Sequence, residues 1–237
     1  ANYNTPEVAK ALVRVYEHFG YEIMVPDQHC SGTPMFANGM LEDARRSAET
    51  NVRELAWALE DGADIIASCS SCSMSLRQEY PELFDFEGTE DVAANTWDAV
   101  EYLRVHEDLE SELEGTSVGD EFDDFAYHAP CHARNQGLDG QTVEVLDAID
   151  GVEAHDVGDS CSGISGTYGW KEENYETSMK IGSEMFEHME DAEATTGLTE
   201  CPTCSMQMEH GTGYEITHTL EVLEAALVGP AAEADGQ

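Results

Sequence analysis

The order of apolar and polar positions along the chain predicts helices and short strands in alternation. Apolar residues at helical spacing predict amphipathic helices over residues 5–20, 41–59, 92–113, 142–149, 174–189 and 219–228. Short apolar runs predict strands over residues 21–25, 63–67, 122–127, 152–157 and 194–199. One more helix is predicted to begin at Cys72, with Pro81 closing it or the loop that follows.

Strands that alternate with helices are typical of the α/β class, in which the strands are parallel. We therefore expect an α/β fold with two pseudo-symmetric lobes, each a short parallel sheet flanked by helices. Loops at the carboxyl ends of parallel strands converge on one crevice. Every cysteine of this chain follows a predicted strand, so we expect metal sites at the carboxyl ends of the strands.

The seven cysteines form two copies of one pattern. The first cysteine set consists of Cys30, Cys69 and Cys72, and the second cysteine set consists of Cys131, Cys161, Cys201 and Cys204. In both copies a Cys-Ser-Gly sequence precedes a Cys-x-x-Cys sequence, by 39 residues in the first and by 40 in the second. A repeat of this kind indicates a duplicated structural unit.

The repeat also predicts the domain boundaries. We expect a first lobe over residues 1–90, an acidic connecting segment over 91–121, a second lobe over 122–228 and a frayed tail over 229–237. Cys131 precedes Cys161 by 30 positions, and the same step back from Cys30 falls one residue before Ala1. We therefore expect the natural chain to have an eighth cysteine there, which would complete the first set.

The charge of the chain is strongly one-sided. Its 237 residues include 10 Lys and Arg against 50 Asp and Glu, for a formal net charge of −40. Such a charge can indicate disorder, but the periodic apolar segments favour a folded protein from a very salty cytoplasm, where self-repulsion is screened. The same charge argues against nucleic-acid binding, because few cations are present to neutralise phosphates.

Thiolates in this arrangement suit iron–sulfur clusters and zinc. The second cysteine set has enough ligands for one [4Fe–4S] cluster or, as the alternative, one four-cysteine zinc site. The first set is one ligand short. Inert buried cysteines and a redox-active dithiol are the other interpretations, but two matched copies favour metal binding.

Other residues beside the cysteines are candidates for a supporting role. His128 and His132 lie on either side of Cys131 and could bind metal or relay protons. Glycines follow Cys161 at regular spacing, beginning with Gly163, but their spacing does not match the dinucleotide-binding fingerprint. We therefore expect them to allow close approach of the backbone to a cluster or a partner.

Three segments resemble the CCG-domain family of cysteine-rich iron–sulfur proteins. They are Cys30-Ser-Gly-Thr-Pro-Met-Phe-Ala-Asn-Gly39, Tyr127-His-Ala-Pro-Cys-His132 and Gly163-Ile-Ser-Gly-Thr-Tyr-Gly-Trp-Lys-Glu-Glu-Asn-Tyr175. Within the family these segments are most similar to the cysteine-rich subunit of anaerobic glycerol-3-phosphate dehydrogenases. That subunit has an N-terminal ferredoxin-like part, which we expect this chain to lack. The resemblance implies an electron-transfer subunit, peripheral on the inner face of the cell membrane, that receives electrons from a flavoprotein subunit. It also implies a membrane-anchoring partner subunit and quinone as the eventual acceptor.

The sequence departs from the family pattern at two positions. Where the family has Cys-Cys-Gly, this chain has Ser31 and Ser162 in the second position. In heterodisulfide reductase, whose cysteine-rich subunit is a family member, the doubled cysteine supports non-cubane clusters and disulfide chemistry. One thiolate fewer at each site favours an ordinary electron-transfer cluster, with the two serines beside the metal. A subunit that reduces disulfides and a zinc-stabilised interaction module stay open as alternatives.

Overall fold

The structure is a computed structural model that describes residues 4–119, 122 and 124–229. The first half contains α1 (Pro6–His18), α2 (Thr33–Ala37), α3 (Leu41–Glu60), β1 (Ile65–Ala67), α4 (Ser70–Met74), η1 (Ser75–Glu79), α5 (Tyr80–Leu83), α6 (Thr89–Ala94), β2 (Thr96–Asp98), α7 (Ala99–His106) and α8 (Leu109–Leu113). The second half contains β3 (Asp124–Tyr127), α9 (Cys131–Asn135), α10 (Gln141–Leu146), β4 (Glu153–Asp156), η3 (Tyr168–Trp170), η4 (Glu172–Asn174), α11 (Tyr175–Asp191), β5 (Thr196–Leu198), α12 (Pro202–Thr212), β6 (Ile216–Thr217) and α13 (Thr219–Leu227). Most of the predicted elements are present, within a few residues of their expected ends.

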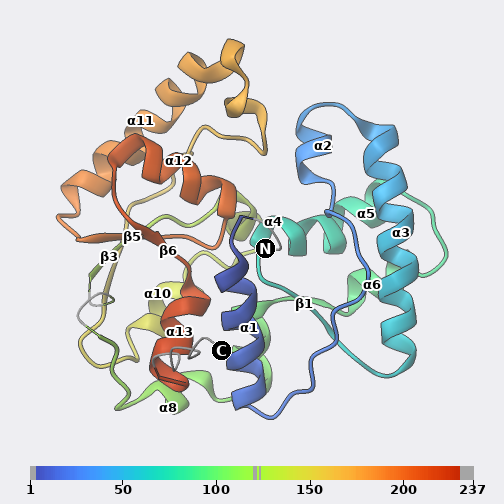
Figure 1. The fold of residues 1–237 in the computed structure, drawn as a ribbon, viewed down its shortest axis with the longest axis horizontal. Helices are drawn as coiled ribbons and strands as arrows, with labels where there is room; N and C mark the ends of the chain where they lie inside the picture. Colours follow the sequence, from blue (N-terminus) through green and yellow to red (C-terminus); the bar gives the residue numbers. More distant parts are fainter. Residues whose placement is uncertain (1–3, 120–121, 123, 230–237) are drawn as a thin grey trace, which may run out of the picture.

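Two short parallel sheets organise the fold, which confirms the α/β class. One sheet pairs β1 with β2, and the other has the strand order β4-β3-β5-β6. Helices surround both sheets (Figure 1). Because the strands of each sheet are parallel, their carboxyl ends lie at one edge of the sheet. The cysteines that follow β1, β3 and β5 are located at these edges.

The largest core joins the beginning of the described chain to its end. Helix α1 lies beside α13 (Figure 1), and both bury apolar residues in one cluster that also contains Phe125 of β3. Val15 and Leu220 are fully buried members of this cluster. At its margin Arg14 forms an ion pair with Glu224 at 2.5 Å. The two halves of the chain therefore share a hydrophobic core.

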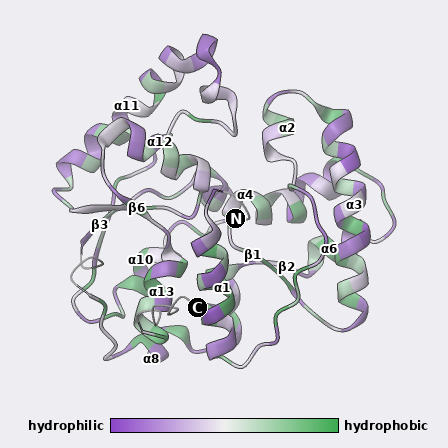
Figure 2. Ribbon diagram, in the orientation of Figure 1, coloured by the Kyte–Doolittle hydropathy of each residue, from purple (hydrophilic) through white to green (hydrophobic). Residues whose placement is uncertain are grey.

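Each half also has a smaller core of its own. In the first half, α3 buries the predicted apolar stripe, which includes Ala48, Val52 and Leu55, and the helix in Figure 2 shows alternating hydrophilic and hydrophobic residues. In the second half, α11 and α12 bury Met185 and Met208 together with two cysteines. These cores fix the helices that position the cysteine sets.

The predicted strand over residues 21–25 is wrong. The segment is irregular coil, and Val25 is 77% exposed. The ring of Tyr21 lies 5.6 Å from the ring of Tyr16, and its hydroxyl donates a hydrogen bond to Glu107. These contacts hold the segment against α1 and the end of α7.

The predicted helix over residues 92–113 is also wrong. It is interrupted after α6 by β2, which pairs with β1, and continues as α7 and α8. Asp98 causes the break, because its side chain caps α7 by accepting from the amides of Val100 and Glu101, and Glu101 returns the interaction. Strand β2 thus adds part of the acidic connecting segment to the first sheet; the lobe boundaries themselves stay a prediction.

The helix that follows the first Cys-x-x-Cys differs at both ends from the prediction. It begins at Ser70 rather than Cys72, and it continues past Pro81 to Leu83. A π-helical turn, η1, ends at Glu79, two residues before Pro81. The altered hydrogen-bond spacing of such a turn accommodates the missing amide hydrogen of proline. Helix α12 and strand β6 were not predicted, and the tail from residue 230 onward lies outside the described residues.

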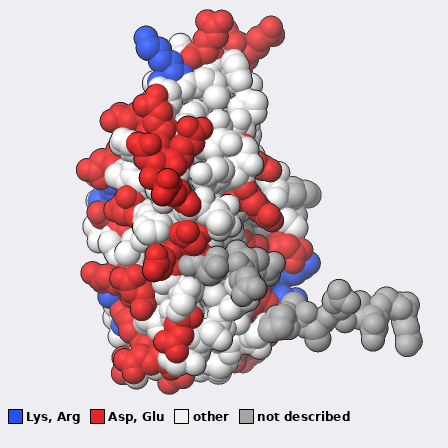
Figure 3. All heavy atoms as spheres, turned by 90° about the vertical axis from the view of Figure 1, so that its left-hand side faces the viewer, with Lys and Arg blue, Asp and Glu red and all other residues white. Residues whose placement is uncertain are grey.

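Groups of acidic side chains are scattered over the face shown in Figure 3, with few basic side chains among them. Within residues 4–119, 122 and 124–229, no helix is both long enough and apolar enough to cross a bilayer.

Asp98 is an exception to the exposed acids, and it gives the first testable prediction. Burial, together with the nearby carboxyl of Glu200, raises the pKa of Asp98 to about 7. An aspartate in the unfolded chain releases its proton near pH 4. The contribution of Asp98 to the free energy of unfolding therefore falls as pH rises from about 4 to 7, by at most about 1.4 kcal/mol per pH unit. Asp98→Asn should therefore flatten the decline in unfolding free energy over this range, measured by urea denaturation. The exposed Asp85→Asn variant is the control, and identical slopes for the two variants would contradict the prediction.

Candidate metal centre

The second cysteine set is positioned by three separate loops at the carboxyl edge of the larger sheet. Cys131 begins α9 after β3, and Cys161 lies in the loop after β4. Cys201 is the N-terminal cap of α12 after β5, and Cys204 lies in the first turn of that helix. Cys201 and Cys204 are buried, whereas Cys131 and Cys161 are exposed. The set therefore has a closed side and an open side.

The four thiols of this set are electrostatic neighbours. The pKa of Cys131 is raised by partial burial of its thiol and by the nearby thiols of Cys161 and Cys201. Hydrogen bonding with Cys204 lowers the pKa of Cys201 well below its ordinary value and raises that of Cys204. The shared charge makes it costly to ionise all four together without a cation. A bound metal group would remove that cost, so the donor set fits one.

Hydrogen-bond donors point at the sulfur atoms of the second set. The Gly163 amide donates to Cys161 Sγ at 3.3 Å, and the Cys204 amide donates to Cys201 Sγ at 3.5 Å. The Thr203 hydroxyl lies 3.2 Å from Cys201 Sγ, and the Ser162 hydroxyl donates to Cys204 Sγ at 3.3 Å. Amide and hydroxyl donors of this kind stabilise the negative charge of cluster thiolates.

Gly163 is required by the packing of the Cys161 loop on α11. Its φ is +82°, and a Cβ atom there would stand 2.1 Å from the carbonyl oxygen of Ser178. The Ser178 hydroxyl donates in turn to the Gly163 carbonyl at 2.9 Å. A Cβ at Gly166 would lie 3.2 Å from that of Ala37 in α2. The glycines thus allow close approach, as expected, but to neighbouring helices of this chain.

Gly163→Ala should lower the free energy of unfolding by roughly 2–4 kcal/mol, because it adds both a steric clash and a strained backbone. Gly151→Ala is a matched control, since Gly151 has φ +83° but nothing within 4 Å of an added methyl group. Urea denaturation of the two variants measures the difference. Equal losses of stability would show that the contact with Ser178 has no role.

The first cysteine set is held by a polar network on α3 and α5. The Asn51 side chain accepts from the His29 amide at 2.7 Å and donates to the Cys30 carbonyl at 3.3 Å. The Tyr80 hydroxyl donates to the Ser31 carbonyl at 2.9 Å and accepts from Asn51. Sequence reasoning missed both Asn51 and Tyr80. A polar Asn51 on the buried stripe of α3 was the available signal, because a buried amide needs partners.

The two Cys-x-x-Cys sequences lie close to each other in the fold, although they are far apart in the sequence. The pKa of Cys69 is raised well above its ordinary value, first by hydrogen bonding to Cys201 and then by Cys72. Cys69 follows β1 and Cys201 follows β5, so both sheets deliver a thiol to the same place. The structure therefore brings the two cysteine sets together, which the sequence repeat alone did not predict.

The predicted histidines have different surroundings. The Nδ1 atom of His132 lies 2.7 Å from the Ser71 hydroxyl, so His132 links α9 to the first Cys-x-x-Cys. His128 is buried, and burial followed by the charge of Arg134 lowers its pKa to about 4. Its Nδ1 has no hydrogen-bond partner among the described residues. His128 is therefore neutral, and metal binding by either histidine stays a prediction.

Within the described part of the chain, no group of three or more His, Cys, Asp or Glu side chains is close enough to hold a single metal ion. This gives no support to the zinc alternative, since four-cysteine zinc sites gather their sulfurs around one ion. The thiolates of an iron–sulfur cluster stand farther apart because each binds a different iron atom.

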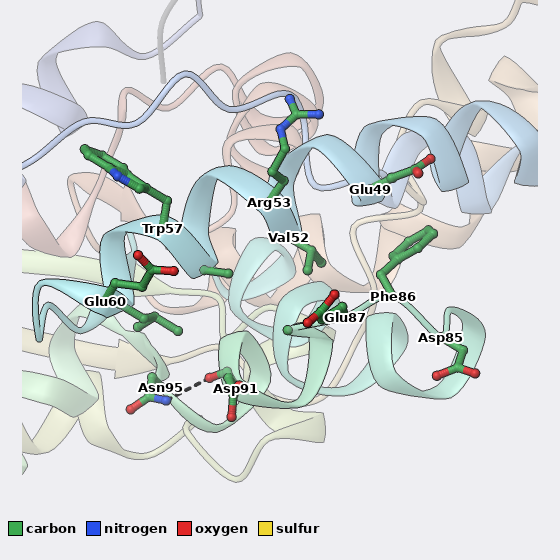
Figure 4. A pocket seen from close by; sticks show the side chains of 13 residues that line it. Glu49, Val52, Arg53, Trp57, Glu60, Asp85, Phe86, Glu87, Asp91 and Asn95 are labelled. Atoms are coloured by element: carbon green, nitrogen blue, oxygen red, sulfur yellow. Dashed lines mark hydrogen bonds between the residues drawn. The ribbon is translucent and has the colours of Figure 1, made fainter.

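A surface groove lies elsewhere on the described part of the chain. It has a volume of about 1000 Å³ and is lined by α3 and residues 85–95, with Trp57, Phe86 and several acids at its wall (Figure 4). The residues that line it include none of the described cysteines. It is therefore separate from the candidate metal centre.

Comparison with known proteins places this arrangement in a family. The model of the CCG cysteine-rich domain matches residues 1–77 and 125–209, which contain both cysteine sets. The chain is 34% identical over 232 residues to a subunit of the anaerobic glycerol-3-phosphate dehydrogenase of Escherichia coli K12, covering 95% of this chain and 57% of that protein. It is 30% identical over 237 residues to a subunit of the fumarate reductase (CoM/CoB) of Methanothermobacter marburgensis, covering 95% of this chain and 44% of that protein.

A third relative is similar in length. Lactate utilization protein A of Lysinibacillus sphaericus is 26% identical over 235 residues, which cover 92% of this chain and 96% of that protein. In contrast, the chain spans about half the length of the first two relatives. The family model matches well over half of the chain and includes all seven cysteines. This protein belongs to the CCG cysteine-rich domain family.

Proposed function

We propose that this chain is an iron–sulfur electron-transfer subunit of a larger oxidoreductase. The observation that supports it most is the convergence of the second cysteine set, whose sulfurs receive amide and hydroxyl hydrogen bonds. When bound there, an iron–sulfur cluster supplies one-electron oxidation and reduction. The relatives named as dehydrogenase and reductase subunits are consistent with this role.

In this proposal the second cysteine set binds one [4Fe–4S] cluster, with all four thiols as ligands. Cys30, Cys69 and Cys72 are ligands of a second site. Asn51 and Tyr80 hold the Cys30 loop in place, and Gly163 holds the Cys161 loop on α11. The chain's own residues thus position sulfurs and exclude water from Cys201 and Cys204.

The partners proposed are a flavoprotein dehydrogenase subunit as donor and a membrane-anchoring subunit that passes electrons to quinone. The resemblance to the glycerol-3-phosphate dehydrogenase subunit supports this choice. The exposed sides of Cys30, Cys131 and Cys161 are where electrons would enter or leave, because electron transfer requires a short distance to the partner's cofactor. The chain would then lie on the inner face of the cell membrane through its partners.

A thiol- or disulfide-reducing role is the second candidate, favoured by the similarity to the fumarate reductase (CoM/CoB) subunit. Ser31 and Ser162 argue against it, since each replaces a family cysteine with a hydroxyl that hydrogen-bonds to a thiol.

The two roles are separated by reducing the anaerobically prepared protein in molar KCl and recording its EPR spectrum. An electron carrier should give an S = 1/2 signal that a quinone analogue removes by reoxidation and that added thiols leave unchanged. A signal whose line shape changes when a thiol is added would indicate an open iron site and favour the second candidate. A protein without a reducible signal would overturn both.

A further inference from the structure

Each cysteine set contains the same hydroxyl-to-sulfur hydrogen bond. Ser162 Oγ donates to Cys204 Sγ at 3.3 Å, and Ser31 Oγ donates to Cys72 Sγ at 3.4 Å. In both cases the serine follows the first cysteine of the Cys-Ser-Gly sequence, and the acceptor is the second cysteine of Cys-x-x-Cys. The contact therefore recurs in two surroundings that differ in sequence, which indicates that it is a feature of the site.

Both serines are buried, with 2% exposure for Ser162 and 7% for Ser31. Among the described residues, neither hydroxyl has a second hydrogen-bond partner. A buried hydroxyl that lost its acceptor would cost roughly 1–3 kcal/mol, so the sulfur is the group that satisfies it. A serine that bound iron would instead have to lose its proton, and no base contacts Ser162 Oγ in the described structure.

We propose that Ser162 is a hydrogen-bond donor to the Cys204 thiolate that raises the reduction potential of the cluster in the second cysteine set. The inference rests on the proposed function, because it requires a cluster at that site. Reduction adds negative charge that is shared with the cysteine sulfurs, and a hydroxyl donor stabilises that charge. Ser162 is therefore a positioning and tuning residue, and Ser31 has the same role at the first set.

The surroundings of the two sets predict an asymmetry in their potentials. In the second set, Cys161, Cys201 and Cys204 each receive at least one hydrogen bond from an amide or hydroxyl. In the first set, within the described residues, only the Ser31 contact with Cys72 is of this kind. Ser71, which occupies the place of Thr203, is instead held by His132. The second site should therefore be the one reduced first.

The test compares Ser162→Ala with the wild type by iron and sulfide analysis and by an EPR-monitored redox titration. Iron and sulfide should stay at the wild-type level while the midpoint potential falls, because a donor and not a ligand has been removed. Ser162→Thr, which keeps a hydroxyl, should return the potential toward the wild-type value. Ser183→Ala is the matched control, since Ser183 is exposed and bonds only to Lys180 of its own helix in the described structure.

Two results would overturn the inference. An unchanged midpoint potential in Ser162→Ala would show that the hydrogen bond has no influence, and loss of iron from a folded Ser162→Ala would identify the serine as a ligand. If circular dichroism shows that Ser162→Ala is unfolded, a second experiment is used instead. The Thr203→Val variant, which keeps Ser162, is exposed briefly to D₂O, and its reduced cluster is studied by pulsed EPR. A rapidly exchanging deuteron coupled to the reduced cluster is then expected, and its absence would overturn the inference. A wild type without a cluster would instead refute the proposed function.

Discussion

Cys201→Ala should abolish the reducible signal of the second cysteine set. Cys201 is buried just after β5, and hydrogen bonding with Cys204 favours its thiolate by lowering the pKa of Cys201. Removing it leaves three thiols around a group that requires four, so we expect iron per chain to fall by about four atoms for a cubane. Iron analysis and EPR of the reduced variant measure the loss.

The loss has to be distinguished from a general collapse of the fold. Cys30→Ala is the matched control, because Cys30 is exposed, belongs to the first set and should leave the second-set signal intact. Cys161→Ala should reproduce the loss from a different, exposed loop. Retention of the full signal in both Cys201→Ala and Cys161→Ala would contradict the assignment of these residues as ligands.

Stability should rise steeply with salt. The chain has 50 acids against 10 Lys and Arg, and Figure 3 shows many acidic side chains on one face. The distance over which charges interact falls from about 10 Å at 0.1 M salt to about 3 Å at 1 M, so repulsion among exposed carboxylates is screened. We expect the Tm to increase by roughly 10 °C or more between 0.1 and 2 M KCl, equivalent to several kcal/mol.

The shape of this salt dependence identifies its cause. Screening saturates as the interaction distance shrinks, whereas exclusion of a cosolute from the surface grows steadily with concentration. The increase should therefore be largest below about 1 M KCl and should level off above it. A Tm that does not change with KCl, or that rises in proportion to KCl throughout, would contradict an electrostatic origin.

The sequence was sufficient for the parts of the fold that depend on local pattern. The stripe on α3, the strands before Cys69, Cys131 and Cys201, and the two cysteine sets all follow from spacing. The errors at residues 21–25 and 92–113 have a different origin. There, tertiary contacts and capping decided the structure: Tyr21 packs on an aromatic neighbour, and Asp98 begins a new helix.

The candidate site was predictable in its ligands and not in its supporting contacts. Two matched Cys-x-x-Cys sequences are rare enough to be recognised in one chain. Their meeting at Cys69 and Cys201 depends on how two sheets are placed in space, which no local pattern encodes. Asn51 bonds to the Cys30 carbonyl and Tyr80 bonds to the Ser31 carbonyl. Each partner lies more than 20 positions away in the sequence, so only the tertiary structure shows these contacts.

The most direct test of this account is the content of iron, acid-labile sulfide and zinc in the anaerobically prepared wild-type protein. If the second cysteine set binds a cubane cluster, each chain should contain about four irons and four sulfides with little zinc. A second cluster in the first cysteine set would raise the iron content and the sulfide content by equal amounts. Stoichiometric zinc without sulfide would contradict the account and leave a structural metal module in its place.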